Sequence, residues 1–193
     1  MRRLDLVVGP NGAGKSTFVE QRLAPLLPNS VFVNADVIAM DRWPGVAEEL
    51  SYEAAQIAAT IRDALIEQGE SFIAETVFLH PSKLELIDRA CQAGYVVVLR
   101  VVLVPVELSV ARVTERVVEG GHSVPEEKIR ERFKRLWSLV VDAIDRVDHA
   151  TVYDNTAADA TRIVARFVDG DAIGEIAWPA WTPHELALAG GRH

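Results

Sequence analysis

Near its beginning the sequence reads Gly9-Pro10-Asn11-Gly12-Ala13-Gly14-Lys15-Ser16-Thr17. A glycine, four residues and then Gly-Lys-Ser form the phosphate-loop pattern, which requires a strand before it and a helix after it. The apolar run Leu4–Val8 precedes the pattern, and Ser16–Ala24 can form a helix that ends at Pro25. A glycine-rich turn that binds nothing is therefore disfavoured. We expect these nine residues to bind ATP, with Lys15 on the outer phosphates and the Ser16 hydroxyl on Mg²⁺.

The bulk composition is that of an ordinary globular protein, with 193 residues, 49% hydrophobic and 25% charged. The net charge of -8 disfavours a nucleic-acid partner, because binding to nucleic-acid phosphates favours a basic surface. The single cysteine, Cys91, has no internal disulfide partner. The longest apolar run, Tyr95–Val104, is too short for a membrane span, and the phosphate loop lies where a signal peptide would be cleaved. We expect a cytoplasmic protein that binds neither nucleic acid nor membrane.

Strands and helices alternate over the first 155 residues, which predicts an α/β fold with a parallel five-stranded sheet flanked by helices. The expected strands are Leu4–Val8, Ser30–Asn34, Ser71–Thr76, Tyr95–Leu103 and Ala150–Tyr153. Asp41–Gly45 is interpreted as a loop. A C-terminal β-hairpin of Arg162–Val168 and Ala172–Trp178 is expected as an addition to the sheet. We predict one P-loop domain, with its core at about residues 1–156, a lid at about 117–130, and the hairpin and tail at 157–193.

Acidic residues follow two expected strands, at the sheet edge where open α/β folds bind ligands. We interpret Asp36 as the base that accepts a hydroxyl proton; the alternative is an N-cap for Val37–Met40. Glu75 and Thr76 end the third strand and are expected to face the substrate. Glu75 has two alternative roles, as a ligand of the Mg²⁺ site together with Ser16 or as a cap of the next helix.

Arginines gather on both sides of Gly120-Gly121. Arg112 and Arg116 lie four residues apart, so their charges repel by a few tenths of a kcal/mol unless an anion lies between them. The next predicted helix carries Arg130, Arg132, Lys134 and Arg135. A glycine-hinged turn between two such helices is typical of a lid that excludes water from a triphosphate. We expect Arg116 and Arg130 to be the functional pair; ion pairs with nearby glutamates are the alternative for the other arginines.

Two further stretches are candidates for binding. Arg42 and Trp43 are candidates for an acceptor pocket, although Trp43 equally suits a loop anchor. Asn155 follows the fifth expected strand, where a nucleotide base can be recognised. The alternative is that Asp154 and Asn155 simply form a turn.

Taken in order, these stretches resemble the zeta toxin family of P-loop kinases. The resemblance covers about residues 3–168 and is carried by Gly9–Thr17, Asn34–Asp36, Phe72–Thr76, His80-Pro81, Gly120–Pro125 with Lys128, Ile129 and Arg132, and Val152–Asn155. It implies an adenylate-kinase-like fold and transfer of the γ-phosphate of Mg-ATP to a hydroxyl of UDP-N-acetylglucosamine or a related sugar nucleotide. A small antitoxin protein is the implied partner.

The resemblance also implies roles for individual residues. Lys15 and Ser16 would bind phosphates and Mg²⁺, and Asp36 would be the base. The implied substrate-binding segment contains Glu75 and Thr76. The arginines that meet the γ-phosphate would be Arg116 and Arg130.

Three other functions stay open at this point. One is a kinase that acts on a different small metabolite or nucleotide, and another is an ATPase switch without a phosphoryl acceptor. The third is a nucleotide-binding module without turnover, which the combination of Lys15, Ser16 and Asp36 disfavours. A GTPase is disfavoured as well, because the sequence contains no Asn-Lys-x-Asp motif.

Overall fold

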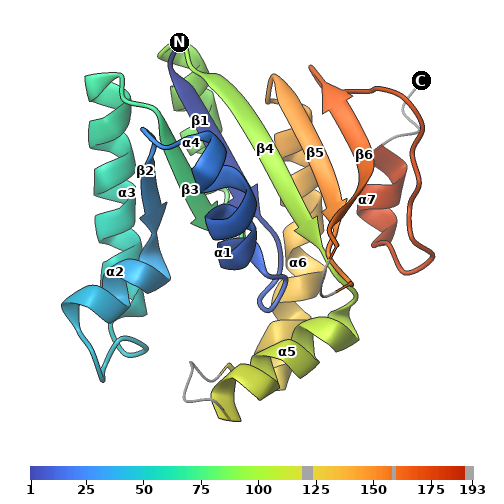
Figure 1. The fold of residues 1–193 in the computed structure, drawn as a ribbon, viewed down its shortest axis with the longest axis horizontal. Coiled ribbons are helices and arrows are strands. Elements are labelled where there is room, and N and C mark those ends of the chain that lie inside the picture. Colours follow the sequence, from blue (N-terminus) through green and yellow to red (C-terminus); the bar gives the residue numbers. More distant parts are fainter. Residues whose placement is uncertain (119–123, 158–159, 190–193) are drawn as a thin grey trace.

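The strands form a single mixed sheet. This computed structural model describes residues 1–118, 124–157 and 160–189, and within them seven strands lie in the order β2-β3-β1-β4-β5-β6-β7 (Figure 1). Their bounds are β1 Arg3–Val8, β2 Val31–Asn34, β3 Phe72–Thr76, β4 Val96–Leu103, β5 His149–Asp154, β6 Arg162–Val168 and β7 Asp171–Ala172. The first five strands are parallel, and β6 and β7 are antiparallel to their neighbours.

The predicted parallel five-stranded sheet corresponds to β1–β5, but the complete sheet is mixed and has seven strands. The C-terminal hairpin belongs to the same sheet, because β6 pairs along the free edge of β5. The second hairpin strand was predicted to reach Trp178, yet β7 ends at Ala172. Gly174, with φ of 74°, interrupts it, although Ile173 and Ala177 still donate backbone hydrogen bonds to Arg166 and Val164 at 2.9 and 2.8 Å.

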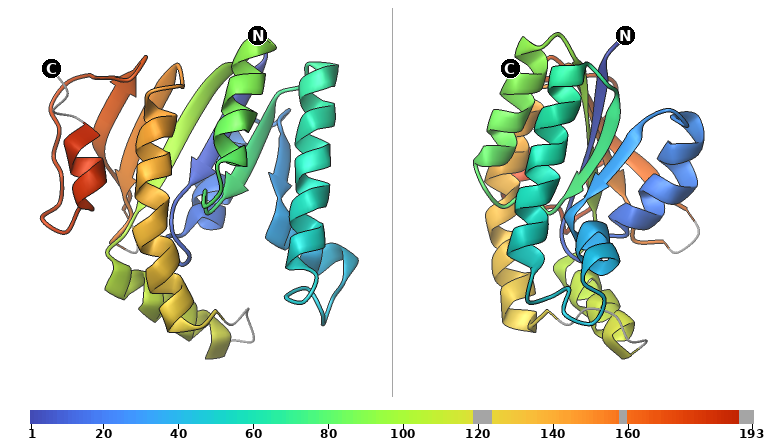
Figure 2. Two further views of the ribbon diagram at one scale, coloured as in Figure 1. Left: turned by 180° about the vertical axis from the view of Figure 1, so that it is seen from behind. Right: turned by 90° about the vertical axis from the view of Figure 1, so that its left-hand side faces the viewer.

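Helices cover both faces of the sheet. Their bounds are α1 Lys15–Phe18, continued by the helical turns η1 Val19–Leu23 and η2 Ala24–Leu26, then α2 Ala35–Arg42, α3 Ser51–Gln68, α4 Ser82–Gln92, α5 Val106–Val118, α6 Glu126–Ile144 and α7 His184–Ala189. Figure 2 shows α3, α4, α6 and α7 on one face and α1 on the other. The helices α2 and α5 lie at the carboxyl-terminal edge of the parallel strands, below the sheet in Figure 1.

The short helix α2 was predicted only as the alternative in which Asp36 caps Val37–Met40, and it is longer than that segment. Asp41 and Arg42, which were interpreted as loop residues, form its last turn. The helix starts directly after β2 because the Asn34 side chain caps it, accepting hydrogen bonds from the backbone N–H groups of Asp36 at 2.7 Å and Val37 at 3.4 Å.

The core explains why the strands are so apolar. Side chains of β1 alternate, with Leu4, Leu6 and Val8 packed beneath the four-helix face and Val7 packed toward α1. The one charge in the central apolar run, Arg100, donates to buried Asp5 of β1 at 2.9 Å. Among the described residues, no helix combines the length and the apolar character that crossing a bilayer requires.

Candidate active site

The phosphate loop connects β1 to α1 and needs glycine at three positions, including Gly9, where an added Cβ would collide with the Val102 carbonyl oxygen of β4. Gly12 and Gly14 have φ of 71° and 83°, a region that side-chain-bearing residues rarely adopt. A Cβ at Gly12 would lie 2.6 Å from the Ser109 carbonyl oxygen of α5, and one at Gly14 would lie 2.6 Å from Asn155 Nδ2. The loop is therefore packed against α5 on one side and the end of β5 on the other.

Asn155 braces the phosphate loop. Its Nδ2 donates to the Ala13 carbonyl oxygen at 2.8 Å, and its Oδ1 accepts from the Thr161 hydroxyl at 2.9 Å. It also lines a hollow of about 310 Å³ together with Thr17, Arg22 and other residues. The turn interpretation holds for its neighbour, since Asp154 Oδ1 accepts from the backbone N–H and the hydroxyl of Thr156.

Lys15 is buried at the start of α1, and its Nζ donates to the Pro10 carbonyl oxygen at 3.0 Å. Burial lowers the pKa of Lys15, and the charge of Arg116 acts in the same direction, whereas the carboxylates of Glu75 and Asp36 oppose the shift. A buried ammonium group among residues of both signs is suited to an anionic ligand, which would restore the solvation that burial removes.

Glu75 is held from two sides. Its Oε1 accepts from the Ser16 hydroxyl at 3.1 Å, and its Oε2 accepts from Asn34 Nδ2 at 2.7 Å. These contacts bring a hydroxyl and a carboxylate together beside Lys15, and hydroxyl and carboxylate oxygens are the donors that Mg²⁺ prefers. The donor set of Ser16 and Glu75 thus fits a Mg²⁺ ion. No group of three or more His, Cys, Asp or Glu side chains suited to a metal occurs within residues 1–118, 124–157 and 160–189, so much of such an ion's shell would come from ligand and water.

Asp36 lies in the first turn of α2 and lines the same cavity as Lys15. The alternative in which Asp36 caps the following helix is wrong, because Asn34 is the cap. The carboxylate of Asp36 is exposed and is left available for a ligand.

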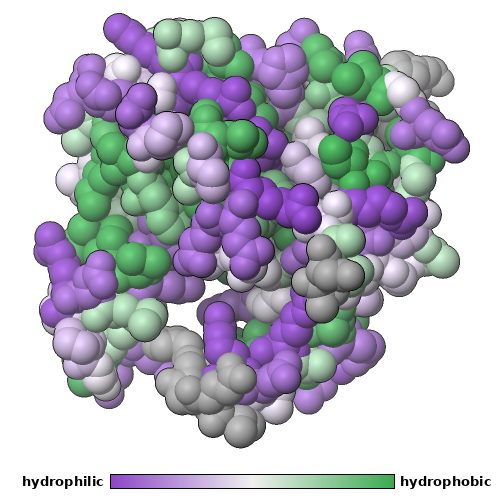
Figure 3. Space-filling view, viewed as in Figure 1, coloured by the Kyte–Doolittle hydropathy of each residue, from purple (hydrophilic) through white to green (hydrophobic). Residues whose placement is uncertain are grey.

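A cavity of about 640 Å³ unites these groups at the carboxyl-terminal edge of the sheet. Figure 3 shows this side of the molecule hollowed between the sheet and α5, with hydrophilic side chains around the opening. The residues around the cavity come from the phosphate loop, β2–α2, α3, β3–α4, α5 and α6: Asn11, Gly12, Gly14, Lys15, Ser16, Thr17, Asn34, Ala35, Asp36, Ala55, Glu75, Thr76, Val77, Phe78, Leu79, His80, Lys83, Arg112, Arg116 and Arg132. Phe78 is fully buried there with φ of 64°, a strained conformation of the kind that gathers at functional sites.

Arg42, Trp43 and Arg130, the candidates for contacts with the acceptor or the γ-phosphate, do not line this cavity. Arg42 is exposed at the end of α2. Arg130 forms ion pairs with Glu107 Oε2 at 2.7 Å and Glu126 Oε1 at 2.8 Å, which tie α6 to α5. The hydrogen bonds from Arg130 lower the pKa of Glu107. The predicted lid turn at Gly120-Gly121 falls outside the described residues.

The structure adds residues that the sequence did not single out for a role. Arg112 and Arg132 line the cavity beside Arg116, and Arg112 also donates to the Thr156 carbonyl oxygen at 3.3 Å. The spacing of Arg112 and Arg116 was a signal for the first, whereas Arg132 contributed to the family resemblance without an assigned role. Asn34 likewise belonged to the resemblance without a role of its own, because its two contacts join separate segments.

Comparisons with known proteins agree on the family and on the fold. The family described as Zeta toxin matches residues 2–165. Among curated proteins, none matches this chain. Two solved structures illustrate the similarity in fold. The AvrRxo1-ORF1:-ORF2 structure with ATP is 18% identical with a TM-score of 0.70, over 91% of this chain and 61% of that chain. The PezAT chromosomal toxin-antitoxin system of Streptococcus pneumoniae is 15% identical with a TM-score of 0.63, over 83% of this chain and 71% of that chain.

A shikimate kinase from Acinetobacter baumannii, solved in complex with shikimate, has a TM-score of 0.51 at 22% identity, over 74% of this chain and 80% of that chain. At these identities the likeness concerns the fold alone. The chain spans about 61% of the length of the AvrRxo1-ORF1:-ORF2 chain that it matches.

Proposed function

Because the chain belongs to the zeta toxin family of P-loop kinases, we propose that it transfers the γ-phosphate of Mg-ATP to a hydroxyl of a small molecule. One observation carries the proposal: Lys15, Ser16, Glu75, Asp36 and three arginines surround one cavity at the sheet edge. Phosphoryl transfer requires charge neutralisation, positioning and a proton acceptor, and these groups supply all three.

The donor half of the site is the phosphate loop. Its backbone N–H groups and Lys15 would hold the phosphates of ATP, and Ser16 with Glu75 would hold Mg²⁺. The ion would neutralise charge on the phosphate oxygens when it is bound. Asn155 keeps the loop in shape through its contact with the Ala13 carbonyl oxygen. The hollow beside Asn155 shares Gly14, Thr17 and Arg112 with the main cavity and is where we place the nucleotide base.

The acceptor half lies around Asp36, Thr76 and Arg116. The oxygen of the acceptor hydroxyl forms a bond to the γ-phosphorus, and the bond from that phosphorus to the oxygen it shares with the β-phosphate breaks. The hydroxyl proton passes to the carboxylate of Asp36, and ADP leaves with the electron pair of the broken bond. Arg116 and Arg132 compensate the negative charge of the transferred group, as basic side chains do in other phosphoryl-transfer sites.

The acceptor we propose is UDP-N-acetylglucosamine or a related sugar nucleotide. Support comes from the family match and from the extent of the cavity, which adjoins a second hollow of about 580 Å³ through Lys83. A long, polar acceptor with a sugar and phosphates suits two connected hollows better than a compact alcohol does.

We further propose that a small antitoxin protein binds this chain. The support is the family match together with the similarity in fold to a chain of the PezAT toxin-antitoxin system.

The test is a transfer assay with Mg-ATP and a panel of sugar nucleotides, free sugars and other metabolites. The expected result is that one sugar nucleotide gains the mass of a single phosphoryl group while an equal amount of ADP forms. Formation of ADP without modification of any acceptor would instead support an ATPase switch. The absence of both ADP and a modified acceptor would contradict an enzymatic role.

A further inference from the structure

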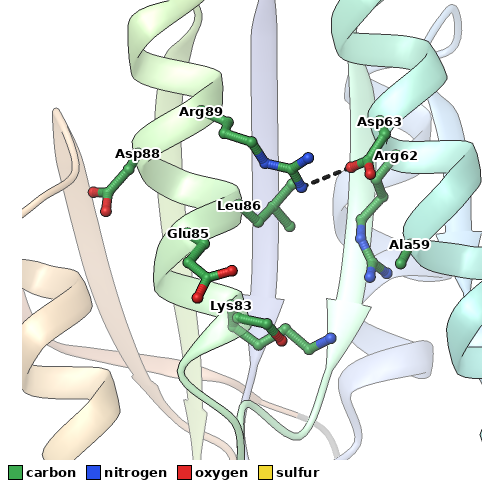
Figure 4. A pocket seen from close by; sticks show the side chains of 9 residues that line it. Ala59, Arg62, Asp63, Lys83, Glu85, Leu86, Asp88 and Arg89 are labelled. Carbon is green, nitrogen blue, oxygen red and sulfur yellow. Dashed lines mark hydrogen bonds and ion pairs between the residues drawn. The ribbon is translucent and has the colours of Figure 1, made fainter.

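A second hollow of about 580 Å³ opens between α3 and α4, on the sheet face opposite α1 (Figure 4). It meets the active-site cavity at Lys83, which lines both. The linings of the two hollows also follow each other along α3, where Ala55 lines the first, and Ala59 and Arg62 line the second. These three residues lie four and three positions apart, so they share one face of the helix, and the two alanines leave that face open.

Arg62 is the unusual residue of this hollow. It is only 6% exposed, and its guanidinium has no hydrogen-bond or ion-pair partner within the part of the chain that the structure describes. Figure 4 shows the side chain running from α3 into the space between the two helices, toward the level of Lys83. The guanidinium carries five donors and keeps its charge, and its nitrogens reach the hollow rather than being sealed in the core, so a ligand in the hollow can pair with them.

Among the described residues, no acidic group around the hollow forms a hydrogen bond or ion pair with Arg62; burial lowers the pKa of Arg62, and the charge of nearby Asp63 only partly opposes that shift. Asp63 accepts from Arg89 at 2.6 Å, and Asp88 accepts from Arg146 at 2.6 Å, so both carboxylates already have cationic partners. Glu85 is the remaining acidic group, and it is exposed on α4. The residue that this hollow shares with the active-site cavity, Lys83, is basic.

Lys83 completes a pair of cations. It is half-buried in the first turn of α4, and in Figure 4 its ammonium group points toward α3, the helix that carries Arg62. Burial lowers the pKa of Lys83, and the charge of Arg62 lowers it further. Two cations that repel each other in a partly dry hollow are both stabilised by an anion bound between them.

We propose that Arg62 and Lys83 form a subsite for an anionic group, a phosphate or a carboxylate, on the phosphoryl acceptor. The acceptor then spans from this subsite to Asp36, which receives the proton of its hydroxyl. This inference rests on the proposed function, since it assigns the acceptor a negative charge. Planar guanidinium groups recognise phosphate and carboxylate through two parallel hydrogen bonds, which gives the subsite its selectivity.

The first experiment uses inorganic phosphate as the probe and the full chain saturated with Mg²⁺ and a non-hydrolysable ATP analogue, so that the phosphate loop is filled. The unfolding temperature is followed against phosphate concentration, with sodium chloride at matched ionic strength as the reference. We expect phosphate to stabilise the wild type and Arg135→Met, in which the altered arginine pairs with Glu131 on α6 and does not line the hollow. Arg62→Met and Lys83→Met should weaken the apparent phosphate affinity about 10- to 100-fold.

The unfolding temperature without phosphate distinguishes a binding role of Arg62 from a structural role. Because Arg62 has no protein partner, replacing it with methionine should leave that temperature unchanged or raise it. A marked loss of stability would show that Arg62 has a structural role and would overturn the proposal. Arg62→Lys, which keeps the charge and loses the planar fork, should show an intermediate phosphate response. An undiminished response in all variants, or none in the wild type, also overturns the subsite.

A second measurement keeps the subsite and the proposed function apart. In the transfer assay, Arg62→Met should raise KM for phosphate-bearing or carboxylate-bearing acceptors about 10- to 100-fold and leave nucleotide binding unchanged. If the wild type modifies no acceptor while phosphate still binds through Arg62, the proposed function fails and the anion site stands. If transfer proceeds and Arg62→Met leaves KM unchanged, the subsite fails and the kinase stands.

Discussion

Asn34 Nδ2 donates a hydrogen bond to Glu75 Oε2 at 2.7 Å, while the oxygen of the same amide caps α2. One buried side chain at the end of β2 therefore orients the carboxylate at the end of β3 and starts the helix that carries Asp36. A single residue, Asn34, therefore positions both the proposed metal ligand Glu75 and the proposed base Asp36.

Replacing Asn34 by aspartate separates its two roles. Aspartate is as good an N-cap as asparagine, so α2 should persist, but a second carboxylate would face Glu75 without a donor between them. We expect ATP turnover at neutral pH to fall by about tenfold or more with little loss of helix. Asn34→Ala, which also loses the cap, should lower the free energy of unfolding by about 1 kcal/mol or more. Turnover at the wild-type level in Asn34→Asp would contradict the orienting role.

Glu75→Gln tests the magnesium site. The substitution keeps the size of the side chain and removes the charge that Mg²⁺ would require, so the apparent Mg²⁺ affinity in the transfer reaction should weaken by about tenfold. Ser16→Ala should act in the same direction. The control for the lost Ser16 hydroxyl is Thr60→Ala, which should leave the Mg²⁺ affinity unchanged. Thr60 is exposed on α3, and its hydroxyl donates to the Gln56 carbonyl oxygen. Equal Mg²⁺ dependence in all variants would remove Glu75 and Ser16 from the metal site.

Asp36→Asn tests the base. We expect kcat to fall about 100-fold or more, because the amide cannot take the hydroxyl proton, while the dissociation constant for ATP stays within about threefold. Both quantities can be measured on one preparation, by rapid-quench transfer and by fluorescence titration with a nucleotide analogue. The control is Asp41→Asn, an exposed aspartate on the same helix that does not line the cavity. Unchanged transfer in Asp36→Asn would exclude it from the chemistry.

We expect opposite results for the arginines that line the cavity and for Arg130, which does not. Arg116 and Arg132 line the cavity, so Arg116→Met and Arg132→Met should each lower kcat about tenfold or more. Arg130 is engaged by Glu107 and Glu126, and Arg130→Met should change kcat by less than about threefold if those ion pairs persist during turnover. A loss in Arg130→Met as large as that in Arg116→Met would show that Arg130 leaves its glutamates to meet the phosphate, as the sequence predicted.

Asp154 makes stability depend on pH. Burial raises the pKa of this carboxyl, but hydrogen bonds from Thr156 and Arg162 outweigh burial and leave the pKa below its usual value. A lowered pKa in the folded state means that the carboxylate stabilises the fold above its unfolded pKa of about 4, and that this stabilisation is lost as the pH falls through the folded value. Asp154→Asn should therefore lower the free energy of unfolding by about 1–2 kcal/mol at pH 7 and by progressively less below about pH 4.

Urea unfolding at several pH values measures the effect on Asp154→Asn. Asp171→Asn, which replaces an exposed aspartate of β7, provides a control and should leave the free energy of unfolding close to that of the wild type. A stability difference for Asp154→Asn that is constant from neutral to acid pH would contradict the assigned pKa shift.

The local parts of the fold were predictable from the sequence because their causes are local. The glycine pattern from Gly9 to Gly14 requires positive φ angles, and the apolar run before it can only be buried. The alternation of strand and helix led to the parallel core β1–β5, and the family match confirms the resemblance that the ordered motifs suggested. The cap and the bounds of the short helix α2 were not predicted, since its start depends on the amide of Asn34, which a scan for apolar periodicity does not detect.

Long-range contacts decided the rest. Which arginine meets the cavity depends on how α5 and α6 pack. Arg130 reaches Glu107 across 23 residues of sequence, while Arg132, two residues later, lines the cavity. The pairing of β6 with β5 and the closeness of Arg62 to Lys83 are likewise properties of the packed chain. The sequence by itself determined a phosphate loop in a parallel α/β core, because backbone conformation and hydrophobic burial are encoded residue by residue. Only the tertiary structure decided which charges pair with one another and which remain free for a ligand, because a charge finds its partner through space.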